Sequence, residues 1–171
     1  VVLDLMIHDI DIVLHIIGSP LRTLCASGVA VLTRLPDIAS VRMEFANGAV
    51  ANLTASRIST KNMRKLRIFQ ENSYYVADYA ERRAYAVYRE QEPDEEGYPQ
   101  VSMEEMEIEE RDALEEEILS FLGAVKGGPP PAVGGREGKE ALAVALQISS
   151  QISSSLSEPG KREGSGSSKF S

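Results

Sequence analysis

Apolar residues recur at spacings of three and four over positions 3–17, a period that predicts a helix with one side against a core. Gly18 ends this helix and is followed by Ser19 and Pro20, because glycine accepts a left-handed C-cap and proline cannot continue a helix. The apolar side consists of Leu3, Ile7, Ile10, Leu14 and Ile17, widened by Val2, Met6 and Val13.

From residue 21 onward the pattern predicts strands. In the segment 40–59, Val41, Met43 and Phe45 alternate with charged residues, which indicates one buried and one solvated face. Asn47-Gly48 between strand-like flanks predicts a hairpin with a type I′ turn, which needs positive φ at both positions. The runs lie mostly too close together for helical crossovers, so we expect antiparallel pairing. The other strand-like runs are 21–32, 66–70, 73–80, 84–88 and, with poorer alternation, 101–110.

The last third of the chain predicts two helices. Asp112 and Glu115 resemble a capping box, and Gly127 followed by Pro129–Pro131 ends the first helix. The expected fold is an α+β domain over residues 1–158, an open, mostly antiparallel or mixed sheet of about six strands with helices from both chain ends on one face. We expect a disordered Gly/Ser-rich tail at 159–171. Apolar residues line the first helix at Leu114, Ile118, Phe121, Leu122 and Val125, and the second, from about Arg136, at Leu142, Ala145, Leu146, Ile152 and Leu156.

Composition narrows the function classes. The 171-residue chain carries a net charge of −8, which argues against nucleic acid as a partner, since phosphate binding needs a basic surface. No apolar run reaches membrane-spanning length, and the single cysteine, Cys25, cannot form an internal disulfide. We therefore expect a cytoplasmic domain without a membrane partner. Because the sequence does not begin with Met, we expect Val1 to be an internal position of a longer protein.

The first helix carries an unusual polar stripe. At about 100° per residue, Asp4, His8, Asp11 and His15 fall within an arc of roughly 60°. These side chains could simply be solvated. They could also chelate a metal, although no cysteine cluster or H-E-x-x-H pattern supports that, or perform acid–base chemistry, with a carboxylate orienting an imidazole. The pattern alone leaves the three interpretations open.

Four motifs in order closely resemble the C-terminal domain of the Gfo/Idh/MocA oxidoreductases, a dihydrodipicolinate-reductase-like fold. They are D-x-x-x-H-D-I-D, F-x-N-G-x-x-A-x-L-x-A-S, E-x-x-x-F-L-x-A-V-x-G-G-x-P and G-R-E-G-x-x-A-L. The resemblance covers Val1 to about Ser155. The segment LDLMIHDIDIVL is most similar to a bacterial subgroup that includes UDP-N-acetylglucosamine 3-dehydrogenases.

The resemblance implies oxidation of a hydroxyl of a sugar or nucleotide sugar to a ketone, with hydride passing to NAD or NADP. His8 would be the general base, and Asp4 would hold the substrate and tune His8. Asp11 would be structural, bonding a strand backbone, and His15 a core or rim residue. The family binds its cofactor mainly through an N-terminal Rossmann domain with G-x-G-x-x-G and E-K-P motifs. Neither motif occurs here, so we expect no cofactor ligands in this chain and no turnover by it alone. We also expect no metal ligands, since no metal-binding pattern is present.

Basic residues are weaker candidates for substrate binding. Lys61, Arg64, Lys65 and Arg67 form a patch that could hold a diphosphate, or merely alternate on the wet face of a strand. Arg57 could face the active cleft. In this family the open face of the sheet commonly mediates oligomers, and the tyrosines of 74–88 could serve that purpose or ordinary packing. The alternative function is a self-associating sheet domain without catalysis.

Overall fold

The structure, a computed structural model, describes residues 1–60, 63–94, 96–108, 112–131 and 133–157. The tail expected at 159–171 lies outside the described residues. The chain divides into two compact units, Val1–Ile58 with Pro130–Ser171, and Ser59–Pro129. Each unit has its own antiparallel sheet, one of three strands and one of four within the described residues, which makes the class α+β as predicted.

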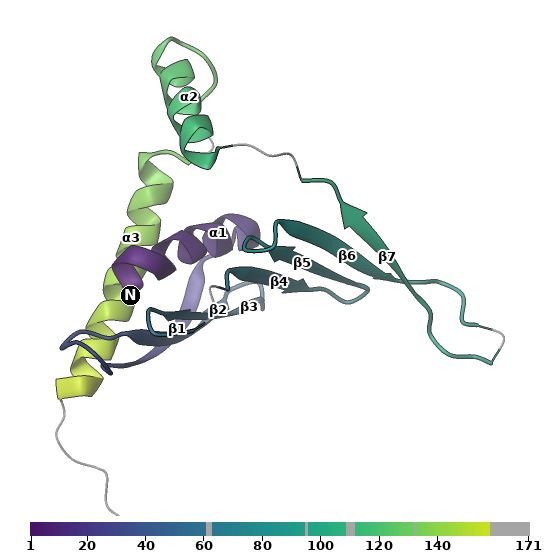
Figure 1. Cartoon of the computed structure of the whole chain (residues 1–171), viewed down its shortest axis with the longest axis horizontal. Coiled ribbons are helices and arrows are strands. Elements are labelled where there is room, and N and C mark those ends of the chain that lie inside the picture. Colours follow the sequence, from purple (N-terminus) through teal and green to yellow (C-terminus); the bar gives the residue numbers. More distant parts are fainter. Residues whose placement is uncertain (61–62, 95, 109–111, 132, 158–171) are drawn as a thin grey trace, which may run out of the picture. The chain divides into compact units, whose positions relative to one another are not determined.

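The first unit begins with a π-helical turn that leads directly into an α-helix. Helix α1 ends at Gly18, which has φ 56° and donates its N–H to the Leu14 oxygen, so the predicted C-cap is confirmed. The three strands follow in the order β1-β2-β3, and α3 packs on α1, the π turn and β1 (Figure 1). The elements are η1 (Val2–Met6), α1 (Ile7–Ile17), β1 (Leu21–Val29), β2 (Ile38–Phe45), β3 (Val50–Ser56) and α3 (Gly135–Ser157).

The core of this unit lies between the sheet and the helices from the two ends of the chain. The predicted inner positions of β2, Val41, Met43 and Phe45, are all buried, which confirms the period-two pattern. Met6 and Ile10 of the N-terminal helix are fully buried against them, whereas Leu3 is 51% exposed. The buried side of the helix is therefore rotated from the predicted one, partly because the first turn is π-helical.

Helix α3 also buries a different side from the one that its large apolar residues indicate. The predicted positions Ala145 and Ile152 are buried, whereas Leu142, Leu146 and Leu156 are exposed. The other buried positions of the helix are Ala141 and Ile148. Small side chains bring the helix axis close to the sheet. At the closest approach a Cβ on Gly28 of β1 would lie 2.6 Å from Cγ2 of Ile152, so this position needs glycine.

Gln151 fastens α3 to the same strand. Its Oε1 accepts the Ala26 N–H at 3.0 Å, and its Nε2 donates to the Leu24 oxygen at 3.1 Å. The side chain is half-buried and spans a sequence separation of 125 to 127 residues. These two bonds fix the register of α3 on β1, because both partners are backbone groups of one strand.

The predicted hairpin between β2 and β3 is present, but its turn differs from type I′. Gly48 has φ 87°, whereas Asn47 does not have positive φ. The Gly48 N–H donates to the Phe45 oxygen, and the Asn47 side chain accepts from Ala49. Ser19 Oγ accepts the Asn47 N–H at 3.1 Å, so contacts outside the hairpin determine the conformation of Asn47.

The second unit is a four-stranded meander in the order β4-β5-β6-β7. The sequence predicts a single sheet, but β3 and β4 belong to separate sheets. The prediction is wrong because the alternation of residues identifies strands without showing which strands are neighbours. The Asp112 carboxylate accepts the N–H groups of Leu114 and Glu115, which confirms the cap, but α2 buries no residue among those described. The elements are β4 (Lys65–Phe69), β5 (Ser73–Asp78), β6 (Arg83–Arg89), β7 (Val101–Met106) and α2 (Ala113–Val125).

Candidate functional site

Asp4 and Arg57 form an ion pair in the first unit. Asp4 lies in the π-helical turn and Arg57 directly follows β3, 53 residues later. Arg57 Nη2 donates to Asp4 Oδ2 at 2.8 Å, with the side chains 40% and 65% exposed. The structure thus brings together two of the residues singled out from the sequence, and a π turn is a frequent feature of functional sites.

His8 lies one turn after Asp4, at the start of α1, and is exposed. Within the described residues no hydrogen bond joins Asp4 to His8, and the bond that the Asp4 carboxylate makes there is to Arg57. His8 is therefore accessible to a ligand. We call Asp4, His8 and Arg57 the candidate site.

The other two residues of the polar stripe contribute less. Asp11 is half-buried, yet no hydrogen bond to a strand backbone is present in the part of the chain that the structure describes, so its expected structural bond is not found. His15 is exposed in the last turn of α1 and so is not a core residue.

Asp37, which the sequence pattern does not single out, holds the backbone next to the candidate site. Its side chain is buried and accepts the N–H groups of Val31, Leu32 and Thr33 at 2.7 to 3.1 Å, and its backbone oxygen accepts the Arg57 N–H at 2.9 Å. These bonds lower the pKa of Asp37 from its ordinary 3.8 to about 2. Asp37 therefore fixes both the loop before β2 and the backbone of Arg57.

The lowered pKa of Asp37 gives a pH-dependent stability. Because the folded pKa is depressed, the stabilisation is complete above about pH 4 and is lost as the pH falls towards 2. We expect Asp37→Asn to lower the melting temperature by several degrees at pH 7, with the difference from wild type shrinking between pH 4 and pH 2. Melting curves by circular dichroism measure this. Glu44→Gln, which alters an exposed ion pair of β2, should change little. A pH-independent difference would contradict the assignment.

The predicted basic patch lies in the second unit and is mostly engaged there. Lys61 lies outside the described residues. The Arg64 guanidinium lies 5.1 Å from the centre of the Tyr79 ring, and Lys65 pairs with Asp78 at 2.8 Å. Lys65 and Arg67 are exposed on β4, where they alternate with half-buried Leu66 and Ile68, a pattern typical of the solvated face of a strand.

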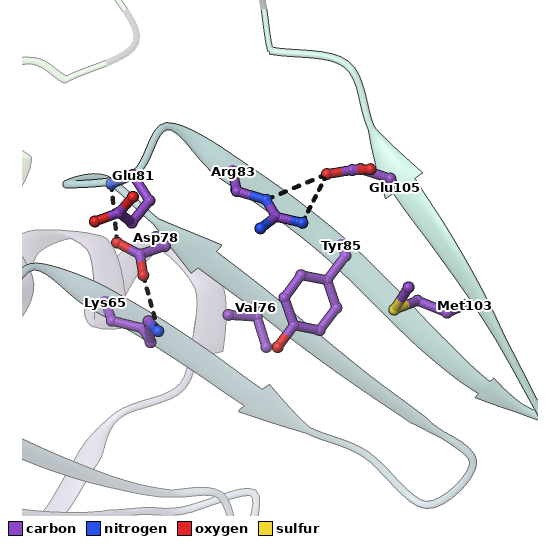
Figure 2. Close-up of a pocket in the computed structure, with 8 residues that line it drawn as sticks. All are labelled: Lys65, Val76, Asp78, Glu81, Arg83, Tyr85, Met103 and Glu105. Carbon is purple, nitrogen blue, oxygen red and sulfur yellow. Dashed lines mark hydrogen bonds and ion pairs between the residues drawn. The ribbon is translucent and has the colours of Figure 1, made fainter.

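A shallow hollow of about 440 Å³ lies on one face of the four-stranded sheet (Figure 2). The Lys65–Asp78 pair borders it on β4 and β5, and Arg83 bonds Glu105 between β6 and β7. Because the charged groups that line it are largely paired with each other, the hollow offers little free charge to a ligand. Its remaining lining residues are Val76, Glu81, Tyr85 and Met103.

Within the described residues no three His, Cys, Asp or Glu side chains come together as metal ligands. Among the described helices none combines the length and the apolar character needed to cross a lipid bilayer.

The sequence pattern identified Asp4, His8 and Arg57 but not their relation, and it missed Asp37. The local pattern gave no signal for Asp37, because the N–H groups that its side chain accepts lie 4 to 6 residues earlier in the chain.

Comparisons with known proteins place these residues in a wider context. Residues 1–76 match the family described as GFO/IDH/MocA C-terminal domain. The chain is 37% identical over 148 residues to a UDP-N-acetylglucosamine 3-dehydrogenase of Acidithiobacillus ferrooxidans, covering 86% of this chain and 47% of that protein. A solved structure of that enzyme superposes with a TM-score of 0.84 at 35% identity, over 92% of this chain and 50% of the other.

Two further proteins match over a similar share of the chain. A myo-inositol 2-dehydrogenase of Thermotoga maritima is 29% identical over 147 residues, 82% of this chain and 43% of that protein. A levoglucosan dehydrogenase in complex with NADH shares the fold, with a TM-score of 0.74 at 15% identity, over 88% of this chain and 47% of the other. The chain thus spans about half the length of the curated relatives that it matches.

Proposed function

Because this chain belongs to the C-terminal domain family of the GFO/IDH/MocA oxidoreductases, we propose that it supplies the substrate-binding half of an NAD(P)-dependent dehydrogenase. The substrate is a sugar or nucleotide sugar, and the reaction oxidises one hydroxyl to a ketone. The observation that carries the proposal is the 37% identity to a UDP-N-acetylglucosamine 3-dehydrogenase across 86% of the chain. That relative also makes a UDP-sugar the first substrate to test.

His8 acts as the general base in this proposal. Its exposed imidazole takes the proton of the sugar hydroxyl, while the hydrogen on the same carbon leaves as hydride. Asp4 holds the substrate beside His8. In a helix whose only role was to cover a core, Asp4 and His8 would have no such chemical role.

A hydride acceptor is required, and the proposed one is NAD or NADP. The described sheets are both antiparallel, and the sequence has no G-x-G-x-x-G turn opening a helix, so this chain does not fit the cofactor's pyrophosphate. We therefore assign none of its residues to the cofactor, which other parts of the protein would hold. The proposed location is the cytoplasm.

Basic side chains contribute to substrate binding in the proposal. Arg57 bonds the Asp4 carboxylate at 2.8 Å, and its contribution is made through that residue. Lys61 and Arg64 are proposed for a nucleotide-sugar diphosphate, since guanidinium and ammonium groups are suited to phosphate oxygens. Arg64 is exposed, and its contact with the Tyr79 ring leaves guanidinium N–H groups for phosphate oxygens.

The test begins with the coding DNA upstream of the Val1 codon. We expect a reading frame that encodes G-x-G-x-x-G and E-K-P motifs, and the complete gene product should reduce NAD or NADP in the presence of UDP-N-acetylglucosamine or a free sugar. The absorbance of the reduced nicotinamide measures turnover. Unrelated upstream sequence together with no turnover on any of these substrates would overturn the proposal.

Self-association is the alternative function and an additional proposal for the complete protein. Large apolar side chains are exposed on one face of the four-stranded sheet, with Phe69 73%, Val101 68% and Met103 70% exposed. Exposed apolar surface of this kind commonly marks an interface. If the complete product shows no turnover but sedimentation shows oligomers, the alternative holds, and the function of the sheet is self-association alone.

A further inference from the structure

The backbone of Arg57 is held in place by hydrogen bonds. Its backbone N–H bonds the Asp37 oxygen at 2.9 Å, and the following residue, Ile58, donates its N–H to Ser56 Oγ at 3.2 Å. Asp37 in turn is held by its own bonds to Val31, Leu32 and Thr33. The Cα of Arg57 is therefore set by the start of β2 and the end of β3, before its side chain meets any ligand.

The guanidinium engages one specific oxygen of Asp4. Nη2 donates to Oδ2 at 2.8 Å, a distance typical of a charge-assisted bond. Within the described residues no hydrogen bond reaches Oδ1 of Asp4, which leaves that oxygen to accept a hydrogen bond from a substrate hydroxyl. The bond to Oδ2 restricts the rotation of the carboxylate, and it therefore narrows the directions open to Oδ1, because both oxygens are attached to the same planar carbon.

We propose that Arg57 is a positioning residue that orients the Asp4 carboxylate towards the substrate beside His8, a role that rests on the proposed function. An exposed ion pair contributes little to folding, so stability is a poor explanation of this contact. Orientation of a group that touches the substrate, by contrast, has large effects on rate, since small misplacements slow a reaction strongly.

The experiment is a double-mutant cycle in the complete, active gene product. Arg57→Ala should lower kcat by about 10²-fold, with KM for the sugar close to wild type. In the Asp4→Ala background the same change should cost almost nothing further, because Arg57 acts through Asp4. Arg57→Lys should recover part of kcat, since an ammonium group can still bond Oδ2. The melting temperature of Arg57→Ala should stay at the wild-type value.

Arg42→Ala provides the matched control. Arg42 makes an exposed ion pair with Glu44 at 3.1 Å on the same sheet. It is neither close in sequence to the residues of the candidate site nor paired with them across the strands, so its removal should leave kcat and KM unchanged. A raised KM with unchanged kcat, additive losses in the cycle, or no loss at all overturns the positioning role while the proposed function stands. An inactive wild-type product overturns both.

Discussion

Replacing His8 with alanine is expected to slow hydride transfer by about 10²–10⁴-fold in the complete gene product, the usual contribution of a general base. The imidazole is exposed at the start of α1 and packs in no core, so the variant should fold normally. Single-turnover measurements of reduced nicotinamide isolate the chemical step from product release. The effect should appear in kcat, because proton removal belongs to the transition state and not to substrate binding.

His15→Ala is the appropriate control for that experiment. His15 is the other histidine of the chain, lies on the same helix and is likewise exposed, but it is not part of the candidate site. Its replacement should leave the rate near the wild-type value. Equal losses from both replacements, or no loss from His8→Ala, would remove His8 from its proposed role.

Ile152→Ala is expected to lower the free energy of unfolding of the first unit by about 2–5 kcal/mol. Ile152 is fully buried on α3, so truncation removes apolar contacts and leaves a cavity over β1. Chemical denaturation followed by circular dichroism measures the change. Leu156→Ala, on the same helix but 48% exposed, should cost much less. Equal costs at the two positions would contradict the observed orientation of α3.

The contact of Ile152 with Gly28 makes a sharper version of this test. Gly28→Ala should destabilise by about 1–3 kcal/mol, because the new Cβ would lie 2.6 Å from Ile152 Cγ2 and 3.1 Å from the Ile38 oxygen. In the Ile152→Ala background much of that cost should disappear, a coupling that independent sites lack. Gly138→Ala, with no atom within 4 Å of the added carbon, should be neutral or stabilising. Additive effects at Gly28 and Ile152 would mean that α3 does not approach β1 here.

Features decided by neighbouring residues were predictable from the sequence. The cap at Gly18, the cap at Asp112 and the alternating burial of β2 depend on backbone conformation and period, and the structure confirms all three. The hairpin at Asn47-Gly48 was predicted in the right place, but its turn type was not, because Ser19 bonds the Asn47 N–H from a distant segment.

Features decided by long-range contacts were not predictable from one sequence. The buried side of α3 depends on how closely alanines allow the helix to approach β1, and large leucines are misleading there. The Asp4–Arg57 pair and the role of Asp37 depend on the ends of β2 and β3 coming beside the first turn of the chain. Individual residues of the candidate site were recognisable, whereas the bonds among them required the structure.

The amide of Gln151 has a consequence for the outer side of β1. An outer strand exposes unpaired N–H and C=O groups on which a foreign strand can start to pair, a common origin of aggregation. The Gln151 amide bonds the Leu24 oxygen and the Ala26 N–H just as the peptide group of an added strand would. The middle of β1 is thus already paired with a side chain of the same molecule, and an invading strand would first have to displace it.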